Sequence, residues 1–282
     1  MIARVTLAAL ALAAVCAGAA RGESLERLAY GDEAEQVGDL RLPDGGGPFP
    51  LAIVIHGGCW LSEVSTLSGT EDLAIALRDA GLATWNVEYR RVGDAGGGWP
   101  GTFRDVGAAT DFAQTLASRY PIDLSRVVVV GHSAGAHLAL WVGARARLPS
   151  SSDLYSESPL GVRGVVALAG PGDLRPLGGF CGTGTLETLC GGSLASAPEH
   201  WAQGSPAALL PLGVPQTLIV GTNDRVVPAS LVEAYERAAR EAGDRVTLVE
   251  VSGADHMQVV DPGSQAWHTV LAEVLALVGS AH

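Results

Sequence analysis

Of the 282 residues in the chain, 48% are hydrophobic and 5% are aromatic, which is enough to bury a large aliphatic core in one or two domains. There are 30 acidic and 18 basic side chains, giving a formal net charge of −12. Binding to nucleic acid requires clustered Lys and Arg against the phosphates, so this balance argues against a nucleic-acid partner.

The N-terminal segment predicts a secretory signal peptide over residues 1–22. "MIARVTLAALALAAVCAGAARGES" has one early Arg, an Ala-rich apolar stretch too short for a good membrane span, and small residues at "AGA" and "ARG". A buried N-terminal helix is the alternative. Cys16 follows the bulky Val15, which argues against a lipoprotein anchor. We therefore expect a secreted or periplasmic protein without a stable membrane anchor, whose mature chain is residues 23–282.

The mature chain alternates predicted strands with predicted helices. Continuous apolar strands separated by helices imply a mostly parallel sheet with helices on both faces, which is an α/β fold in a single domain. The predicted strands cover 51–55, 82–89, 126–130, 162–170, 215–221 and 245–251, and the predicted helices cover 71–81, 102–120, 134–147, 228–243 and 263–278. Residues 171–214 break this rhythm, are rich in Gly and Pro, and are expected to form a cap or lid over a ligand site.

Ser133 is the candidate nucleophile. It lies in "GHSAG", a G-x-S-x-G pattern that directly follows four valines and opens a helix. At such a turn the serine hydroxyl is exposed at the carboxyl edge of the sheet, beside the unpaired N–H groups of the helix. The bare pattern arises easily by chance in a chain with 37 Gly, so its context carries the prediction. The ordinary alternative is a helix N-cap.

A serine nucleophile needs a base and an orienting acid, expected in the order Ser, Asp or Glu, His. Asp224 and His256 lie in loops after the two last predicted strands, at the carboxyl edge of the sheet. His256 is expected to take the proton of Ser133, and Asp224 to fix the tautomer of His256. Asp173, which follows an earlier strand, is the second choice for the acid. Asp255 is next to His256 in the sequence, and the side chains of adjacent residues rarely face each other well enough to pair.

The loop "HGGCW" follows the strand 51–55 and is the candidate oxyanion hole. Acyl transfer needs N–H donors at the place where negative charge develops, and a Gly pair leaves the backbone N–H groups accessible. His56 and Trp60 are expected to brace this loop, and a Gly-rich turn without a ligand is the alternative. The candidate donors, of which two or three would act, are the backbone N–H groups of Gly57, Gly58, Cys59 and Ala134.

Three cysteines remain after the predicted signal peptide. In an oxidising compartment Cys181 and Cys190 could close the loop "FCGTGTLETLCGG", whose glycines let it bend. Cys59 would then have no partner. Two free thiols in a mobile loop are the alternative, and the sequence does not decide between them.

The chain resembles the α/β-hydrolase superfamily. "HGGCW", "GHSAGAHLA", "GPGDLRPL" and "NVEYRR" are similar to a branch with an HGGxW motif that contains arylformamidases (kynurenine formamidase) and secreted carboxylesterases, including carbohydrate and feruloyl esterase types. The resemblance covers most of the mature chain. It implies Ser133 as nucleophile, Asp224 as acid, His256 as base, and an oxyanion loop at 56–60. The predicted signal peptide departs from kynurenine formamidase, which acts on an intracellular metabolite.

The first functional hypothesis is a secreted serine hydrolase that cleaves small carboxylic esters through an acyl-enzyme. The second is a formamidase or amidase of the arylformamidase type, and the third is a catalytically silent binding protein with the same fold. No cofactor is expected, and no Cys or His spacing suggests a metal site. Substrate choice would depend on residues 171–214 and 90–101. Oligomeric state cannot be predicted from this sequence.

Overall fold

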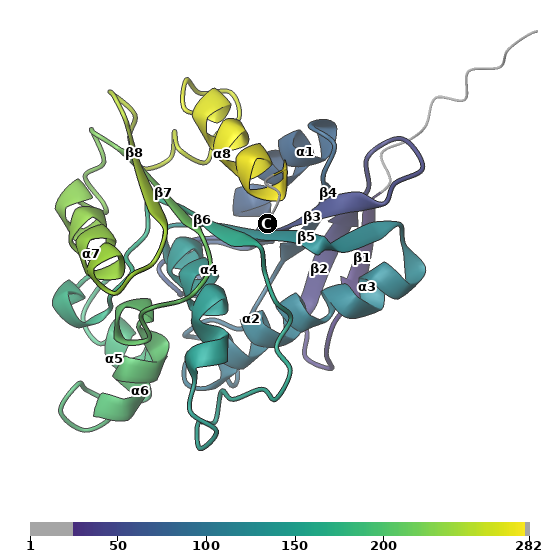
Figure 1. Ribbon diagram of the computed structural model, residues 1–282. Helices are drawn as coiled ribbons and strands as arrows, with labels where there is room; N and C mark the ends of the chain where they lie inside the picture. The colour runs from purple at the N-terminus through teal and green to yellow at the C-terminus, as the bar shows by residue number, and fades with distance from the viewer. Residues whose placement is uncertain (1–24, 280–282) are drawn as a thin grey trace, which may run out of the picture.

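The computed structural model describes residues 25–279, and an eight-stranded sheet with the order β1-β2-β4-β3-β5-β6-β7-β8 forms its centre (Figure 1). The predicted signal peptide, with Cys16, lies outside the described residues. The strands are β1 (Leu25–Ala29), β2 (Val37–Arg41), β3 (Phe49–Ile55), β4 (Ala83–Val87), β5 (Ile122–His132), β6 (Gly164–Leu168), β7 (Gln216–Gly221) and β8 (Val246–Val251). β1 and β2 run antiparallel to their neighbours, and β4, β3, β5, β6, β7 and β8 are parallel. The predicted α/β fold with a mostly parallel sheet is therefore confirmed.

Helices cover both faces of the sheet. They are α1 (Glu71–Asp79), α2 (Gly101–Asp111), α3 (Ala113–Arg119), α4 (Ala134–Ala144), α5 (Thr185–Leu189), α6 (Pro198–Gly204), α7 (Ala229–Glu241) and α8 (Trp267–Gly279). α1 and α8 lie on one face, and α2, α3, α4 and α7 on the other (Figure 1). None of the helices within residues 25–279 has both the length and the apolar character that crossing a membrane requires.

The four valines of β5 show why the sheet is buried on both faces. Side chains alternate along a strand, so Val127 and Val129 join one apolar cluster while Val128 and Val130 join the cluster on the opposite face. All four are fully buried. Every residue of α4, the next element, is buried as well. Ser133 therefore lies between two elements that are held by the core.

The elements differ from the prediction in two places. The helix predicted over 102–120 is interrupted at Phe112 and forms α2 and α3. β1 and β2 were not anticipated, because Asp39 and Arg41 give β2 a polar appearance. Both side chains are buried and paired across the structure, Asp39 with Arg27 and Arg41 with Glu71. Pairing lets charged residues occupy a buried strand.

Residues 171–214, called here the 171–214 segment, contain α5 and α6 and pack against α4. Two buried side chains of α4 bond to the carboxyl end of α6: His137 Nε2 lies 2.8 Å from the carbonyl oxygen of Gly204, and Trp141 Nε1 donates to that of Gln203 at 2.9 Å. The segment is thus attached to the helix that follows Ser133. Its role as a cap stays a prediction.

Candidate active site

The sheet topology places two of the candidate loops side by side. β3 lies between β4 and β5, so the strand order reverses at β3, and α/β sheets bind ligands at the carboxyl ends of strands at such a point. The register pairs Ile55, the last residue of β3, with Gly131 near the end of β5. Residues 56–60, called here the oxyanion loop, therefore start beside the turn that holds Ser133.

Ser133 occupies a strained turn between β5 and α4. Its φ of 55° and ψ of −119° lie in a region that residues other than glycine rarely adopt. The flanking glycines are required for close packing. A Cβ on Gly131 would lie 2.1 Å from the carbonyl oxygen of Gly135, and one on Gly135 would lie 2.2 Å from that of Ile55. The pattern "GHSAG" therefore has a steric cause at both of its glycines.

The loops after β7 and β8 bring Asp224 and His256 together. His256 Nδ1 lies 2.8 Å from Oδ2 of Asp224, whose side chain is fully buried. The backbone N–H groups of Val226 and Val227 donate to the other carboxylate oxygen, each at 2.8 Å. Burial raises the pKa of Asp224, but the hydrogen bonds from His256, Val227 and Val226 outweigh burial and hold that pKa below its ordinary value. The ionised carboxylate keeps a proton on Nδ1 of His256 and leaves Nε2 able to accept one.

His132 connects the loop of His256 to the turn of Ser133. Its Nε2 donates to the backbone carbonyl of His256 at 2.9 Å, and the two rings lie 4.7 Å apart. Burial, with the neighbouring His256, lowers the pKa of His132 to about 4, so His132 is neutral near pH 7. The structure thus places His256 next to the turn that carries Ser133. This contact joins residues more than a hundred positions apart and was not predicted from the sequence.

The other acids considered from the sequence are engaged elsewhere. Asp173 forms an ion pair with Arg175 at 2.7 Å. Asp255 accepts hydrogen bonds from backbone N–H groups of its own loop. Of the three candidates, Asp224 is the one that contacts His256.

The oxyanion loop lies directly against the turn of Ser133. A Cβ on Gly57 would lie 2.8 Å from the carbonyl oxygen of His132 and 3.0 Å from Cβ of Ser133, so only glycine fits there. Ala134 is the first residue of α4, and its N–H has no acceptor within the helix. Within residues 25–279, no hydrogen bond is donated by the backbone N–H groups of Gly57, Gly58 and Cys59. These N–H groups therefore have no acceptor within the described part of the chain.

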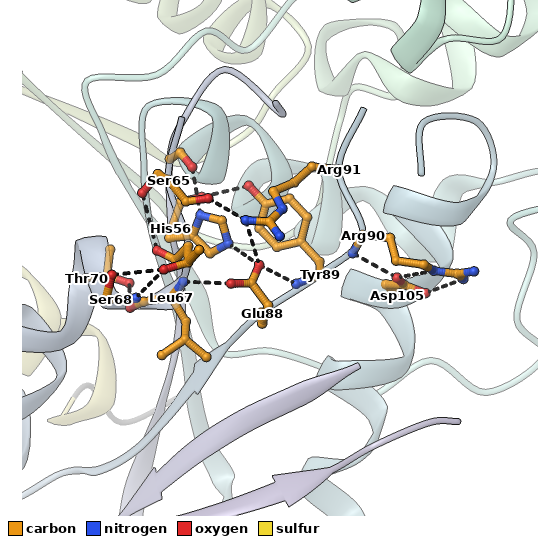
Figure 2. Close-up of polar contacts among 12 residues, drawn as sticks. His56, Ser65, Leu67, Ser68, Thr70, Glu88, Tyr89, Arg90, Arg91 and Asp105 are labelled. Atoms are coloured by element: carbon orange, nitrogen blue, oxygen red, sulfur yellow. Dashed lines mark hydrogen bonds and ion pairs between the residues drawn. The ribbon is translucent and has the colours of Figure 1, made fainter. Parts of the chain in front are cut away.

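His56, the first residue of the oxyanion loop, is buried against Glu88 (Figure 2). His56 Nε2 lies 2.7 Å from Oε1 of Glu88, and His56 Nδ1 lies 2.7 Å from the carbonyl oxygen of Gly57. Burial raises the pKa of Glu88, but hydrogen bonds from His56 and from the backbone of Tyr89 and Leu67 outweigh burial and lower the pKa overall. Each ring nitrogen of His56 thus lies within hydrogen-bond distance of an oxygen.

This pair fixes the orientation of one peptide group in the oxyanion loop. The carbonyl of Gly57 is turned toward His56, and a trans peptide carries its N–H on the opposite side, so the N–H of Gly58 points away from the ring. Tyr89 stacks on His56 at 4.4 Å and donates its hydroxyl to the carbonyl of His56. Glu88 was missed from the sequence, although it follows β4 as His56 follows its parallel neighbour β3.

The disulfide considered between Cys181 and Cys190 does not form. Cys181 is bonded to Cys59, with a Cα–Cα distance of 5.5 Å, and Cys190 is a buried free thiol. The helix α5 begins between the two predicted partners and ends just before Cys190, which it carries into the apolar core. Cys181 stays outside the helix and faces the oxyanion loop. Cys59, expected to have no partner, therefore has one.

Comparisons with known protein sequences give a consistent set of relatives. A family model described as BD-FAE matches residues 39–237, well over half of the chain. Kynurenine formamidase of Danio rerio is 26% identical over 268 residues, which cover 92% of this chain and 83% of that protein. Esterase LipC of Mycobacterium tuberculosis is also 26% identical, over 82% of this chain but only 59% of that protein.

Solved structures share the fold. A truncated carbohydrate esterase from gut microbiota superimposes with a TM-score of 0.77 at 22% sequence identity, covering 90% of this chain and 95% of that one. Esterase 2 of the planctomycete Thermogutta terrifontis gives a TM-score of 0.71 at 19% identity, covering 90% of this chain and 92% of that one. The fold of this chain is therefore the α/β-hydrolase fold.

Proposed function

The chain belongs to the BD-FAE family, an esterase-type hydrolase family, and from this premise we propose that it is a serine hydrolase that cleaves carboxylic esters of small molecules. The observation that carries the proposal is the buried Asp224 held against His256 next to the strained turn of Ser133. If Ser133 were only the N-cap of α4, its role would not require the Asp224 carboxylate and the His256 imidazole beside the turn. These three side chains are the proposed catalytic residues.

The reaction follows from the roles of these groups. Ser133 Oγ attacks the acyl carbon while His256 Nε2 takes its proton, and the negative charge of Asp224 stabilises the imidazolium that forms. His256 then protonates the departing alkoxide, which leaves an acyl-enzyme on Ser133. In the second half, His256 removes a proton from water, the water attacks the acyl carbon, and Ser133 recovers its proton as the carboxylic acid departs.

The oxyanion forms next to N–H groups that have no other acceptor among residues 25–279. We assign this role to the N–H groups of Gly58, Cys59 and Ala134, with Gly57 as the remaining candidate. The orientation of the Gly58 N–H depends on the hydrogen bond between His56 and the carbonyl of Gly57. The pair of His56 and Glu88 thus acts on the reaction through the oxyanion loop.

Replacing Glu88 with glutamine should weaken catalysis without touching the triad. The amide nitrogen cannot accept a hydrogen bond, so either His56 Nε2 or the N–H of Leu67 loses its carboxylate partner, and the Gly57–Gly58 peptide is held less firmly in its orientation. We expect kcat for p-nitrophenyl acetate to fall about tenfold, less than the 10²–10³-fold typical of removing a donor outright. The free energy of unfolding should fall by about 3 kcal/mol, as when one partner of a buried pair is removed. Initial rates and urea denaturation measure the two effects.

The exposed Glu63, three residues after the oxyanion loop, provides the control: Glu63→Gln makes the same chemical change and should alter neither quantity. The pH dependence gives a second check. The pKa of Glu88 is lowered in the folded state, so its stabilisation is present above the unfolded pKa of about 4.3 and is lost as pH falls through the folded pKa. The stability difference between wild type and Glu88→Gln should therefore shrink in acid. A constant difference would contradict the assignment.

Formamide hydrolysis is the second candidate, favoured by the similarity to kynurenine formamidase over most of both chains. The same residues would serve, but the leaving group would be an amine. We propose the ester as the better substrate, and expect kcat/KM for p-nitrophenyl acetate to exceed that for N-formylkynurenine. The reverse order would make the chain a formamidase.

Export of the protein is a further part of the proposal. A disulfide between Cys59 and Cys181 is typical of an oxidising compartment, as is the predicted signal peptide over residues 1–22. We expect the full chain, expressed in a bacterium with a periplasm, to be recovered there with an N-terminus close to residue 23. Full-length protein that stays in the cytoplasm would contradict export.

A further inference from the structure

The disulfide joins two parts of the site that lie far apart in the chain. Cys59 belongs to the oxyanion loop and Cys181 to the 171–214 segment, and they are 122 positions apart in sequence. One end of the bond therefore lies on the backbone assigned above to oxyanion binding. The other end lies in the segment expected to cover that site.

The backbone at Cys59 has a conformation that its surroundings must maintain. Gly58, Cys59 and Trp60 have φ values of 104°, 55° and 56°, and the last two are residues for which positive φ is unfavourable. Trp60 is held by Val92, whose N–H donates to its carbonyl at 2.8 Å. Within residues 25–279, the backbone of Cys59 makes no hydrogen bond. Its covalent bond to Cys181 is therefore the contact that constrains it most directly.

Several glycines near Cys181 have open space beside them. A Cβ placed on Gly178, Gly179 or Gly184 would meet no heavy atom within 4 Å, so the backbone around Cys181 has open space on several sides. Glycine-rich backbone has high conformational entropy when nothing fixes it. The bond to Cys59 attaches this loop to the oxyanion loop.

We propose that Cys59 and Cys181 are positioning residues for acyl transfer: their disulfide holds the Cys59 N–H in place for the oxyanion and holds the 171–214 segment against it. This inference rests on the proposed esterase function. A dithiol reductant such as dithiothreitol would break the S–S bond and leave two thiols, while its own two sulfurs lose two electrons and two protons and close into a disulfide. The reduced enzyme would keep its triad but lose the fixed donor.

Cys181→Ser tests the proposal, with Cys190→Ser as the matched control. Cys190 is buried and unbonded, and burial raises the pKa of its thiol to about 12, so it takes no part in thiol exchange. For p-nitrophenyl acetate we expect Cys181→Ser to lower kcat about tenfold while KM changes less than about threefold, because the donor acts in the transition state. Cys190→Ser should stay within about twofold of wild type in kcat.

Reduction of the wild type gives the same comparison without a mutation. At a temperature well below the unfolding midpoints, dithiothreitol should lower kcat of wild type and Cys190→Ser to the level of Cys181→Ser, and glutathione disulfide should restore it. Cys181→Ser itself should not respond. If the bond only stabilises the fold, its reduction or the Cys181→Ser change would lower the unfolding midpoint and leave kcat of the folded enzyme unchanged, and that result overturns the inference. A wild type that hydrolyses no ester overturns the proposed function, and this inference falls with it.

Discussion

Replacing Ser133 with alanine should lower kcat for short p-nitrophenyl esters by at least about 10³-fold, because loss of a serine nucleophile leaves only binding and the oxyanion donors. The side chain is nearly fully buried between β5 and α4, and alanine removes one oxygen from it without changing its Cβ. We therefore expect the protein to stay folded. Initial rates measure the loss, and thermal unfolding followed by circular dichroism checks the fold.

Ser230→Ala is the matched control for this variant. Ser230 is exposed on α7, and its replacement by alanine should change neither kcat nor the unfolding midpoint. If Ser133→Ala keeps full activity, the serine is not the nucleophile. An equal loss of kcat in Ser133→Ala and Ser230→Ala would show that the loss does not depend on the position of the serine.

Replacing Asp224 with asparagine should lower kcat by about 10³ to 10⁴, the scale expected when an asparagine holds the catalytic histidine in the wrong tautomer. The amide nitrogen can donate to His256 Nδ1, which places the ring proton on Nε2. A protonated Nε2 cannot accept the proton of Ser133. The amide oxygen can still accept from Val226 and Val227, so the loop should keep its shape. Initial rates across the pH range above neutrality measure the loss.

Asp173→Asn is the matched control, because Asp173 was the second choice for the acid and is paired with Arg175 in the structure. We expect its kcat to stay within about threefold of wild type, as is usual for changes away from the reacting groups. A large loss in Asp173→Asn together with a small one in Asp224→Asn would reverse the assignment of the acid.

The parts of the site that local sequence determines were predictable. The residues next to Ser133 indicate its role: valines precede it, small residues follow it, and the turn requires glycine at two flanking positions because a Cβ would not fit there. Asp224 and His256 could be placed because loops at the carboxyl ends of parallel strands share one edge of the sheet. Neither inference required knowledge of a contact between distant side chains.

The disulfide could not be predicted in the same way. Sequence spacing favoured Cys181 with Cys190, which are close in the chain, whereas the structure bonds Cys181 to Cys59 across 122 positions. The pairing depends on where α5 carries Cys190 and on how the 171–214 segment meets the oxyanion loop. Both are properties of the tertiary packing, which spacing does not encode.

The pair of His56 and Glu88 is an intermediate case. Each residue follows a strand, and the register of β3 with β4 pairs Ile55 with Val87, so the next residue of each strand falls opposite the other. Recognising β3 and β4 as neighbours would have been sufficient to predict the contact. β1 and β2 were missed because two buried charged side chains, Asp39 and Arg41, give β2 the polar composition of a loop.

In the proposed mechanism, His256 and Asp224 activate Ser133 to form a covalent intermediate. The most direct measurement is mass spectrometry of the protein, and of its peptides, after treatment with a fluorophosphonate. We expect one adduct on Ser133, none in Ser133→Ala, and much slower labelling in Asp224→Asn. A wild type that remains unlabelled, or that carries its adduct on another residue, would contradict it.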